Sequence, residues 1–280
     1  MKTEETSLKD LMNPGAAEDF FARRKMDPFD PDADPKAFSL PNALWLMELS
    51  RLVYRRQQPE PDPHPSPRSK FLGPQNLEEI AFFSETDETA DTQAILVQST
   101  KGPKWAALVF RGTEQKPTDV ISDLKLSVPH LGSGPIIHRG FKHALDIVWN
   151  DTERNGTKQN GIETELKKPE LEGVPLFMTG HSLGAALATL AAALHTPRAV
   201  YTFGSPMVGN HAFVETMKGV PIHRVVDDID GVTFVPPAFL GYEHVGDVRH
   251  LSEDPEPPLL LHAEKIGFDH APVNYVDRLK

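Results

Sequence analysis

The sequence predicts an α/β fold in which a mostly parallel central sheet carries helices on both faces. From about residue 80 onward, short apolar runs with strand character alternate with helix-forming runs, a pattern typical of such folds. Residues 174–203 form a complete β-α-β unit on this pattern, with a crossover long enough to join two parallel strands. The chain has 280 residues, which is enough to bury the large core that this fold needs.

The elements follow from the local sequence. The first 36 residues are rich in charge and in Asp-Pro steps, so we expect a surface arm of irregular structure, followed by a single domain over residues 37–280. Apolar residues at helical spacing predict an amphipathic helix at 42–56, and alternate prolines at 59–67 favour an extended loop. The other expected strands are 94–98, 105–110, 174–179, 199–203 and 221–226, and the other expected helices are 141–149 and 185–194. The end of the chain is expected to be mostly loop.

Composition limits the classes of protein. A net charge of −11 argues against nucleic acid and against strongly anionic membranes as partners. The longest apolar stretch, 183–194, is too short to span a bilayer, so no transmembrane segment is expected. The chain has no cysteine, which excludes disulfides and thiolate nucleophiles. No apolar leader is visible either, and together these features predict a cytoplasmic location, with a secreted mature form as the alternative. The oligomeric state is not predicted.

The pentapeptide Gly180-His181-Ser182-Leu183-Gly184 lies where a buried strand gives way to a helix of small residues. A Gly-x-Ser-x-Gly sequence at such a switch is typical of the nucleophile elbow of hydrolases. The glycines leave only Ser182 projecting from a sharp turn, and the Leu183 amide at the positive end of the helix can donate to an oxyanion. The alternative is a buried helix with an incidental serine, but the strand before it and the helix after it favour acyl transfer.

A serine hydroxyl needs a histidine to take its proton and an acid to orient that histidine. With this elbow the chain order is serine, acid, histidine. The acids that follow a strand beyond the serine are Asp227, Asp228 and Asp230, and the histidines beyond them are His244, His250, His262 and His270. Spacing alone does not choose within either set. For a second oxyanion donor we expect Thr113, because it follows a buried strand at the edge where ligands gather in open α/β sheets.

Five sequence blocks occur in an order that resembles the class 3 lipase family. They are Val109-Phe110-Arg111-Gly112-Thr113, His138-Arg139-Gly140-Phe141, Gly180-His181-Ser182-Leu183-Gly184, Thr202-Phe203-Gly204-Ser205-Pro206 and Val208-Gly209-Asn210. The similarity runs from about residue 40 to 277. The resemblance implies an α/β-hydrolase-type fold.

The resemblance also selects among the candidate residues. The family's pattern around its acid, with a Pro-Pro pair six residues later, falls on Arg224, Val226, Asp230 and Pro236-Pro237. Its late Asp-His pair, followed closely by Tyr, falls on Asp269, His270 and Tyr275. Asp230 is thereby the favoured acid and His270 the favoured base, while His244 becomes a structural histidine. The two oxyanion donors fall on Thr113 and Leu183.

The resemblance implies a serine carboxylic ester hydrolase, and we expect a lipase that acts on acylglycerol esters through an acyl-serine intermediate without metal or organic cofactor. Its partner is a lipid or small ester substrate, which can lie at a lipid–water interface. Phospholipase A and an esterase for soluble or aromatic esters stay open, because the same fold and triad serve all of them. From a different class, a non-catalytic lipase-like binding protein also stays open.

Two features depart from the family's pattern. The secreted fungal members are usually disulfide-bonded, whereas this chain has no cysteine. The segment expected to form a lid, 117–124, has only a narrow apolar stripe, so we expect modest interfacial activation. The lid and the loops at 235–240 and 259–261 are expected to supply the apolar acyl pocket.

Overall fold

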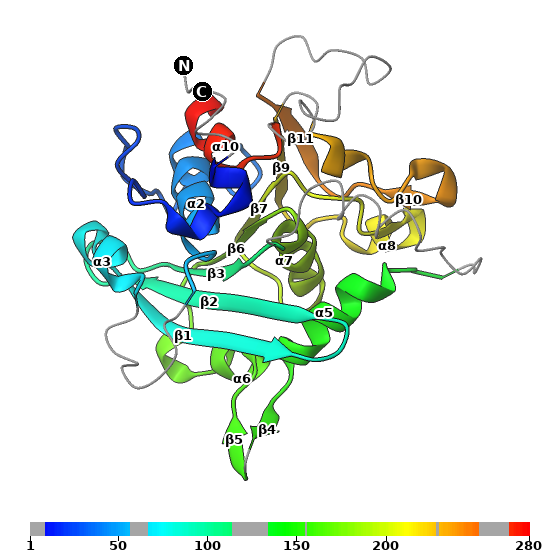
Figure 1. The fold of residues 1–280 in the computed structure, drawn as a ribbon, viewed down its shortest axis with the longest axis horizontal. Helices are drawn as coiled ribbons and strands as arrows, with labels where there is room; N and C mark the ends of the chain where they lie inside the picture. Colours follow the sequence, from blue (N-terminus) through cyan, green and yellow to red (C-terminus); the bar gives the residue numbers. More distant parts are fainter. Residues whose placement is uncertain (1–8, 57–66, 114–133, 155, 228–229, 252–268) are drawn as a thin grey trace.

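The computed structural model describes residues 9–56, 67–113, 134–154, 156–227, 230–251 and 269–280. In this part of the chain the main sheet has seven strands, in the order β1-β2-β3-β6-β7-β9-β11 (Figure 1). Their bounds are β1 Leu77–Thr86, β2 Asp91–Ser99, β3 Ala106–Phe110, β6 Leu176–His181, β7 Ala199–Phe203, β9 Ile222–Val226 and β11 Asp247–His250. β1, β2 and β3 pair antiparallel, and the strands from β3 to β11 pair parallel. The expected mostly parallel sheet is confirmed.

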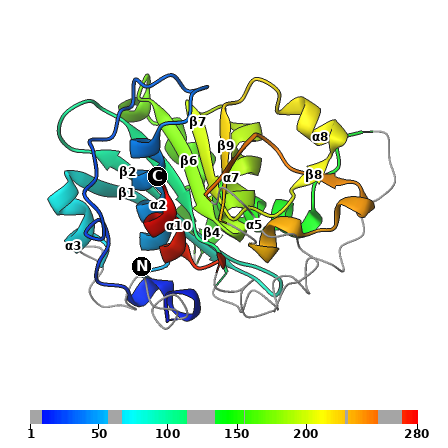
Figure 2. The same ribbon diagram turned by 90° about the horizontal axis from the view of Figure 1, so that it is seen from above.

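Helices cover both faces of the sheet. α2 Leu40–Leu52 and α10 Pro272–Arg278 lie on one face, and α5 Arg139–Trp149 and α7 Leu183–Leu194 lie on the other (Figure 2). Successive strand residues alternate between the two cores, so that Val109 packs in the core under α2 while Leu108 and Phe110 pack in the core under α7. Because both faces are covered, the central strands are continuous apolar runs.

The expected elements are present with ends shifted by a few residues, and smaller elements join them. These are α3 Ser69–Leu72, α6 Ile162–Leu166, α8 His211–Thr216, the hairpin of β4 Thr152–Arg154 and β5 Thr157–Gln159, the pair of β8 Gly209–Asn210 and β10 Tyr242–Glu243, and the 3-10 turns η1 Pro14–Ala16, η2 Gly73–Gln75, η3 Pro169–Leu171, η4 Gly231–Phe234 and η5 Ala238–Leu240. No helix among the described residues combines the length and hydropathy needed to cross a bilayer. The expected lid and the proline tract up to residue 66 lie outside the described residues.

Two elements near the end of the chain differ from the expectation of a loop. β11 is an exposed edge strand whose residues are mostly polar, so it lacks the apolar pattern of a buried strand. α10 begins with Pro272 in its first turn and packs against α2. The side chains of α10 are buried because the helix packs on α2, which is distant in the sequence. The local sequence around residue 272 does not show this contact.

α2 was expected to bury one face, but it is buried on nearly all sides. Even its charged residues Glu48 and Arg51 are each 1% exposed, and they pair with each other at 2.9 Å. The arm is the reason, because Phe20 and Phe21 from residues 9–36 pack into the same core as α2. The division of the chain into an arm and a domain stays a prediction.

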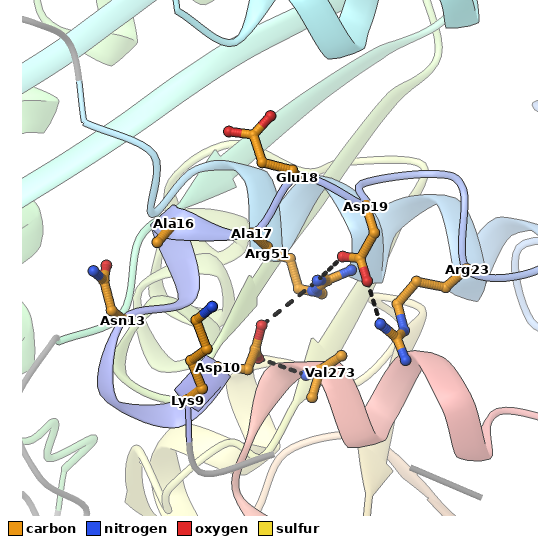
Figure 3. A pocket seen from close by; sticks show the side chains of 10 residues that line it. All are labelled: Lys9, Asp10, Asn13, Ala16, Ala17, Glu18, Asp19, Arg23, Arg51 and Val273. Carbon is orange, nitrogen blue, oxygen red and sulfur yellow. Dashed lines mark hydrogen bonds and ion pairs between the residues drawn. The ribbon is translucent and has the colours of Figure 1, made fainter. Parts of the chain in front are cut away.

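A pocket of about 400 Å³, lined mostly by polar and charged residues, lies where the arm meets α2 and α10 (Figure 3). Arg51 pairs there with Asp19 at 2.8 Å and with Asp10 at 3.5 Å. Asp10 Oδ2 also accepts a hydrogen bond from the Val273 amide at 2.9 Å. Since Val273 lies in the first turn of α10, only three residues after His270, the arm braces the segment that carries His270.

Candidate active site

Ser182 occupies a strained turn between β6 and α7. Its φ is +58° and its ψ is −127°, a conformation that non-glycine residues rarely adopt. A Cβ atom at Gly180 would overlap the backbone of Gly184, and one at Gly184 would overlap the carbonyl of Phe110. The two glycines therefore let strand and helix meet closely enough to form the turn. The Ser182 amide donates to the Phe203 carbonyl at 3.0 Å, which joins the turn to the end of β7.

Asp230 and His270 lie in direct contact beyond the ends of the parallel strands. His270 Nδ1 donates to Asp230 Oδ2 at 2.7 Å, and the two residues are 4% and 0% exposed. Asp230 Oδ1 accepts from the Val232 amide at 3.0 Å. A buried carboxylate with such partners keeps one ring tautomer, in which Nδ1 carries the proton and Nε2 is the acceptor.

Gly204 lies between the serine turn and this pair. Its φ is +59°, and a Cβ there would lie 2.5 Å from Asp230 Oδ2 and 3.1 Å from His270 Nδ1. Gly204 directly follows Phe203, whose carbonyl holds the Ser182 amide. The absence of a side chain at Gly204 thus lets the serine turn, the acid and the histidine lie together.

Tyr275 supplies a second donor to the same carboxylate oxygen. Its hydroxyl donates to Asp230 Oδ2 at 2.6 Å and accepts from the Asp227 amide at 3.3 Å. Tyr275 is fully buried, and burial raises the pKa of its phenol well above the ordinary range, with Asp230 adding to the effect. The hydroxyl therefore keeps its proton and remains a donor.

The other candidate acids and histidines have different surroundings. Asp227 pairs with Arg278 at 2.8 Å, and burial raises the pKa of its carboxyl to about 7. His244 Nε2 donates to the Thr233 carbonyl at 2.8 Å, and burial lowers its pKa to about 4. His250 is exposed at the end of β11. Asp228 and His262 lie outside the described residues.

His181 connects three parts of the site. Its Nε2 donates to the His270 carbonyl at 2.8 Å, and its Nδ1 accepts from the Tyr54 hydroxyl at 3.1 Å. Its burial lowers its pKa well below the ordinary range, so the ring is neutral. The Tyr54 hydroxyl packs against Gly112, which directly precedes Thr113. His181 and Tyr54 thus join the serine turn, the His270 backbone and the turn after β3.

The two expected oxyanion donors follow the ends of β6 and β3, which are neighbouring strands of the sheet. Leu183 is the first residue of α7, where helix amides have no acceptor within the helix. Thr113 follows β3 by three residues, and Phe110 at the end of β3 pairs with Gly180 of β6. The Thr113 Oγ1 atom is buried and has no hydrogen-bond partner among the described residues. An unpaired buried hydroxyl costs stability, and a bound oxyanion would give this hydroxyl an acceptor.

Comparisons with known proteins identify the family of the chain. The family model for lipase (class 3) matches residues 107–240. A lipase from Rhizomucor miehei is 30% identical over 60% of this chain and 51% of its own length. A solved structure, described as a triacylglycerol lipase with a serine protease triad as its catalytic centre, is 30% identical with a TM-score of 0.51, covering 64% of this chain and 68% of that one. The chain belongs to the class 3 lipase family.

A further relative of this class 3 lipase family member is secreted mono- and diacylglycerol lipase 1 from Fusarium solani. It is 29% identical over 58% of this chain and 53% of its own length. The chain spans about half the length of these curated relatives. The family assignment and the sheet together give the α/β-hydrolase-type fold that the sequence predicts.

Sequence reasoning missed the supporting residues of this class 3 lipase site. Tyr275 and Gly204 occur in the sequence blocks that resemble the family, but nothing local shows that both contact Asp230. His181 lies inside the pentapeptide, at a position where the Gly-x-Ser-x-Gly pattern accepts any residue type. Tyr54 lies within residues 42–56, where the sequence predicts an amphipathic helix and no site residue. Only the folded chain brings these four residues together around the serine turn and Asp230.

Proposed function

We propose that the protein is a serine carboxylic ester hydrolase that cleaves acylglycerol esters. The observation that carries this proposal is the buried hydrogen bond from His270 to Asp230, held against the strained serine turn in a chain of the class 3 lipase family. The roles of the individual residues form part of the proposal. Ser182 is the nucleophile, His270 the base, Asp230 the acid, and Thr113 and Leu183 the oxyanion donors.

In the first half of the reaction the Ser182 oxygen attacks the ester carbonyl carbon while His270 Nε2 takes the hydroxyl proton. Asp230 stabilises the imidazolium that forms, because it accepts from Nδ1 and both side chains are buried. The developing oxyanion is held by the amides of Thr113 and Leu183 and by the buried Thr113 hydroxyl. His270 then protonates the leaving alcohol, and the acyl-serine remains.

In the second half, water attacks the acyl-serine carbonyl carbon and gives a proton to His270 Nε2. The tetrahedral intermediate collapses, the fatty acid leaves, and the proton returns to Ser182 Oγ. Each step uses side chains and amides of this chain together with water.

Labelling with a fluorophosphonate tests the nucleophile. The Ser182 oxygen should form a bond to phosphorus with loss of fluoride, and Ser182→Ala should abolish the label and lower kcat roughly 10⁵–10⁶-fold. Ser205→Ala is the matched control, because Ser205 is also buried and lies beside the same strand ends, with its hydroxyl bonded to the Pro206 carbonyl. Labelling that persists in Ser182→Ala would overturn the assignment, and an unlabelled wild-type protein would favour a binding protein.

Exchange of single acids tests Asp230. Asp230→Asn should lower kcat about 10⁴-fold, because the histidine then loses the partner that fixes its tautomer. Asp227→Asn should keep most of the activity, since the Asp227 carboxylate faces Arg278. A greater loss in Asp227→Asn would assign the acid to that residue.

The substrate class is tested by a hydrolysis profile over emulsified mono-, di- and triacylglycerols, phospholipids and short soluble esters. The names of the Rhizomucor miehei and Fusarium solani relatives support acylglycerols. Faster cleavage of a phospholipid would favour a phospholipase A. The relative named as secreted also favours a location outside the cell over the cytoplasmic location expected from the sequence.

A further inference from the structure

Residues 231–242, which we name the uncharged loop, carry no charged side chain, although a quarter of the chain is charged. The loop contains the turns η4 and η5 and directly follows Asp230. Phe239 is 87% exposed and Phe234 is 46% exposed. Most of the Phe239 side chain therefore lies in water, and exposed aromatic groups within a segment without charges are a feature of interaction surfaces.

The uncharged loop is fixed at its base. Thr233 Oγ1 donates to the Asp230 carbonyl at 2.7 Å, and the Met207 amide donates to the Val235 carbonyl at 2.8 Å. His244 Nε2 holds the Thr233 carbonyl, and Tyr242 pairs with β8. Val235, expected to line an acyl pocket, is buried, whereas Phe239 is turned to solvent. The aromatic side chains are therefore displayed from a well-held support.

The position of the loop relates it to the proposed active site. It leaves the carboxyl end of the sheet, and the Asp230 carboxylate caps η4 by accepting from the Val232 amide. We propose that the uncharged loop anchors the protein on the surface of neutral lipid by inserting Phe239 and Phe234. This proposal rests on the proposed function, because the anchor would bring the strand ends with Asp230 to the surface that holds the ester.

Area and charge favour lipid over a protein partner. A phenylalanine buries on the order of 200 Å², so the two exposed rings offer far less than the ~800 Å² per partner of a typical stable interface. Insertion into lipid needs no such area, because each ring gains separately from leaving water. The chain carries a net charge of −11, and the exposed Glu243 flanks the loop, so an anionic surface would repel it. The expected surface is therefore zwitterionic or uncharged.

Binding to phosphatidylcholine vesicles, measured by flotation in the Ser182→Ala background, tests the anchor without hydrolysis of lipid. Phe239→Ser should weaken partitioning roughly 10- to 100-fold, the worth of one buried phenylalanine, and Phe234→Ser should weaken it less. Adding phosphatidylglycerol to the vesicles should weaken binding further. Leu194→Ser is the matched control, because Leu194 is 57% exposed at the far end of α7, and it should leave partitioning unchanged.

Two further measurements keep the outcomes distinct. Phe239→Trp should show a blue-shifted emission on adding vesicles, and the emission of the same protein without this exchange, which comes from Trp45, Trp105 and Trp149, should not shift. Flotation in the Ser182→Ala background measures binding and not turnover, so a failure of the proposed function appears in hydrolysis of a soluble short ester by the wild-type protein and not in flotation. Equal partitioning of Phe239→Ser and Leu194→Ser, or a dimer in sedimentation that Phe239→Ser dissociates, would overturn the anchor.

Discussion

The Tyr275 hydroxyl is the most informative single group to remove. It donates to Asp230 Oδ2 at 2.6 Å, the same oxygen that accepts from His270, and it accepts from the Asp227 amide. Tyr275→Phe keeps the buried ring and deletes both hydrogen bonds. A hydrogen bond to a charged group contributes about 1.5–3 kcal/mol, and an unpaired buried amide costs about 1–3 kcal/mol. Because the two effects share one site, we expect a loss of about 3 kcal/mol.

Thermal unfolding measures this loss. For a protein of this size, about 3 kcal/mol lowers Tm by roughly 6–12 °C. Tyr201→Phe is the matched control, because the Tyr201 hydroxyl is also in a buried side chain but accepts one neutral bond, from the Ser39 amide at 3.2 Å. We expect it to cost about 1 kcal/mol.

Turnover on a soluble ester separates positioning from stability. Asp230 keeps its bonds to His270 and to the Val232 amide in Tyr275→Phe, so kcat should fall about tenfold, with KM nearly unchanged, through looser orientation of the imidazole. Tyr201→Phe should keep the wild-type kcat. If the two variants had the same Tm and kcat, the Tyr275 hydroxyl would not support Asp230 and the reasoning would be refuted.

Two other changes probe the same region. Gly204→Ala should lower kcat at least 100-fold, because its Cβ would lie 2.5 Å from Asp230 Oδ2. Gly219→Ala is the control and should leave kcat unchanged, because Gly219 also has a positive φ but a Cβ there would have no atom within 4 Å. Similar kinetics for the two variants would contradict the close packing at Gly204. Asp227 has a folded-state pKa of about 7 against 3.8 ordinarily, so its stabilising contribution is full below about pH 4 and is lost as the pH rises through 7. In urea, the free energy of unfolding of the wild-type protein should therefore decline between pH 5 and 8, and the decline should be smaller in Asp227→Asn. Equal declines in the two proteins would mean that Asp227 is already ionised in the folded state at pH 5.

The sequence by itself determined the local features of this protein. Continuous apolar runs such as 106–110 and 199–203, alternating with helix-forming runs, favour strands covered on both faces and so predict the parallel sheet. The glycines around Ser182 gave the serine turn, because side chains at those positions would overlap the adjoining backbone. Both conclusions depend on residues within a few positions of one another.

Only the tertiary structure decided what distant residues do together. Asp227 and Asp230 are three positions apart and equivalent by spacing, yet one faces Arg278 and the other faces His270 and Tyr275, about forty residues or more along the chain. The burial of α2 on nearly all sides depends on an arm that reaches it from residues 9–36. The loop 235–240 was expected to supply an acyl pocket, yet in the folded chain Val235 is buried and Phe239 is 87% exposed. Each of these contacts joins residues that are distant in the sequence. A local pattern of residue types therefore does not show which segments pack against each other in the folded chain.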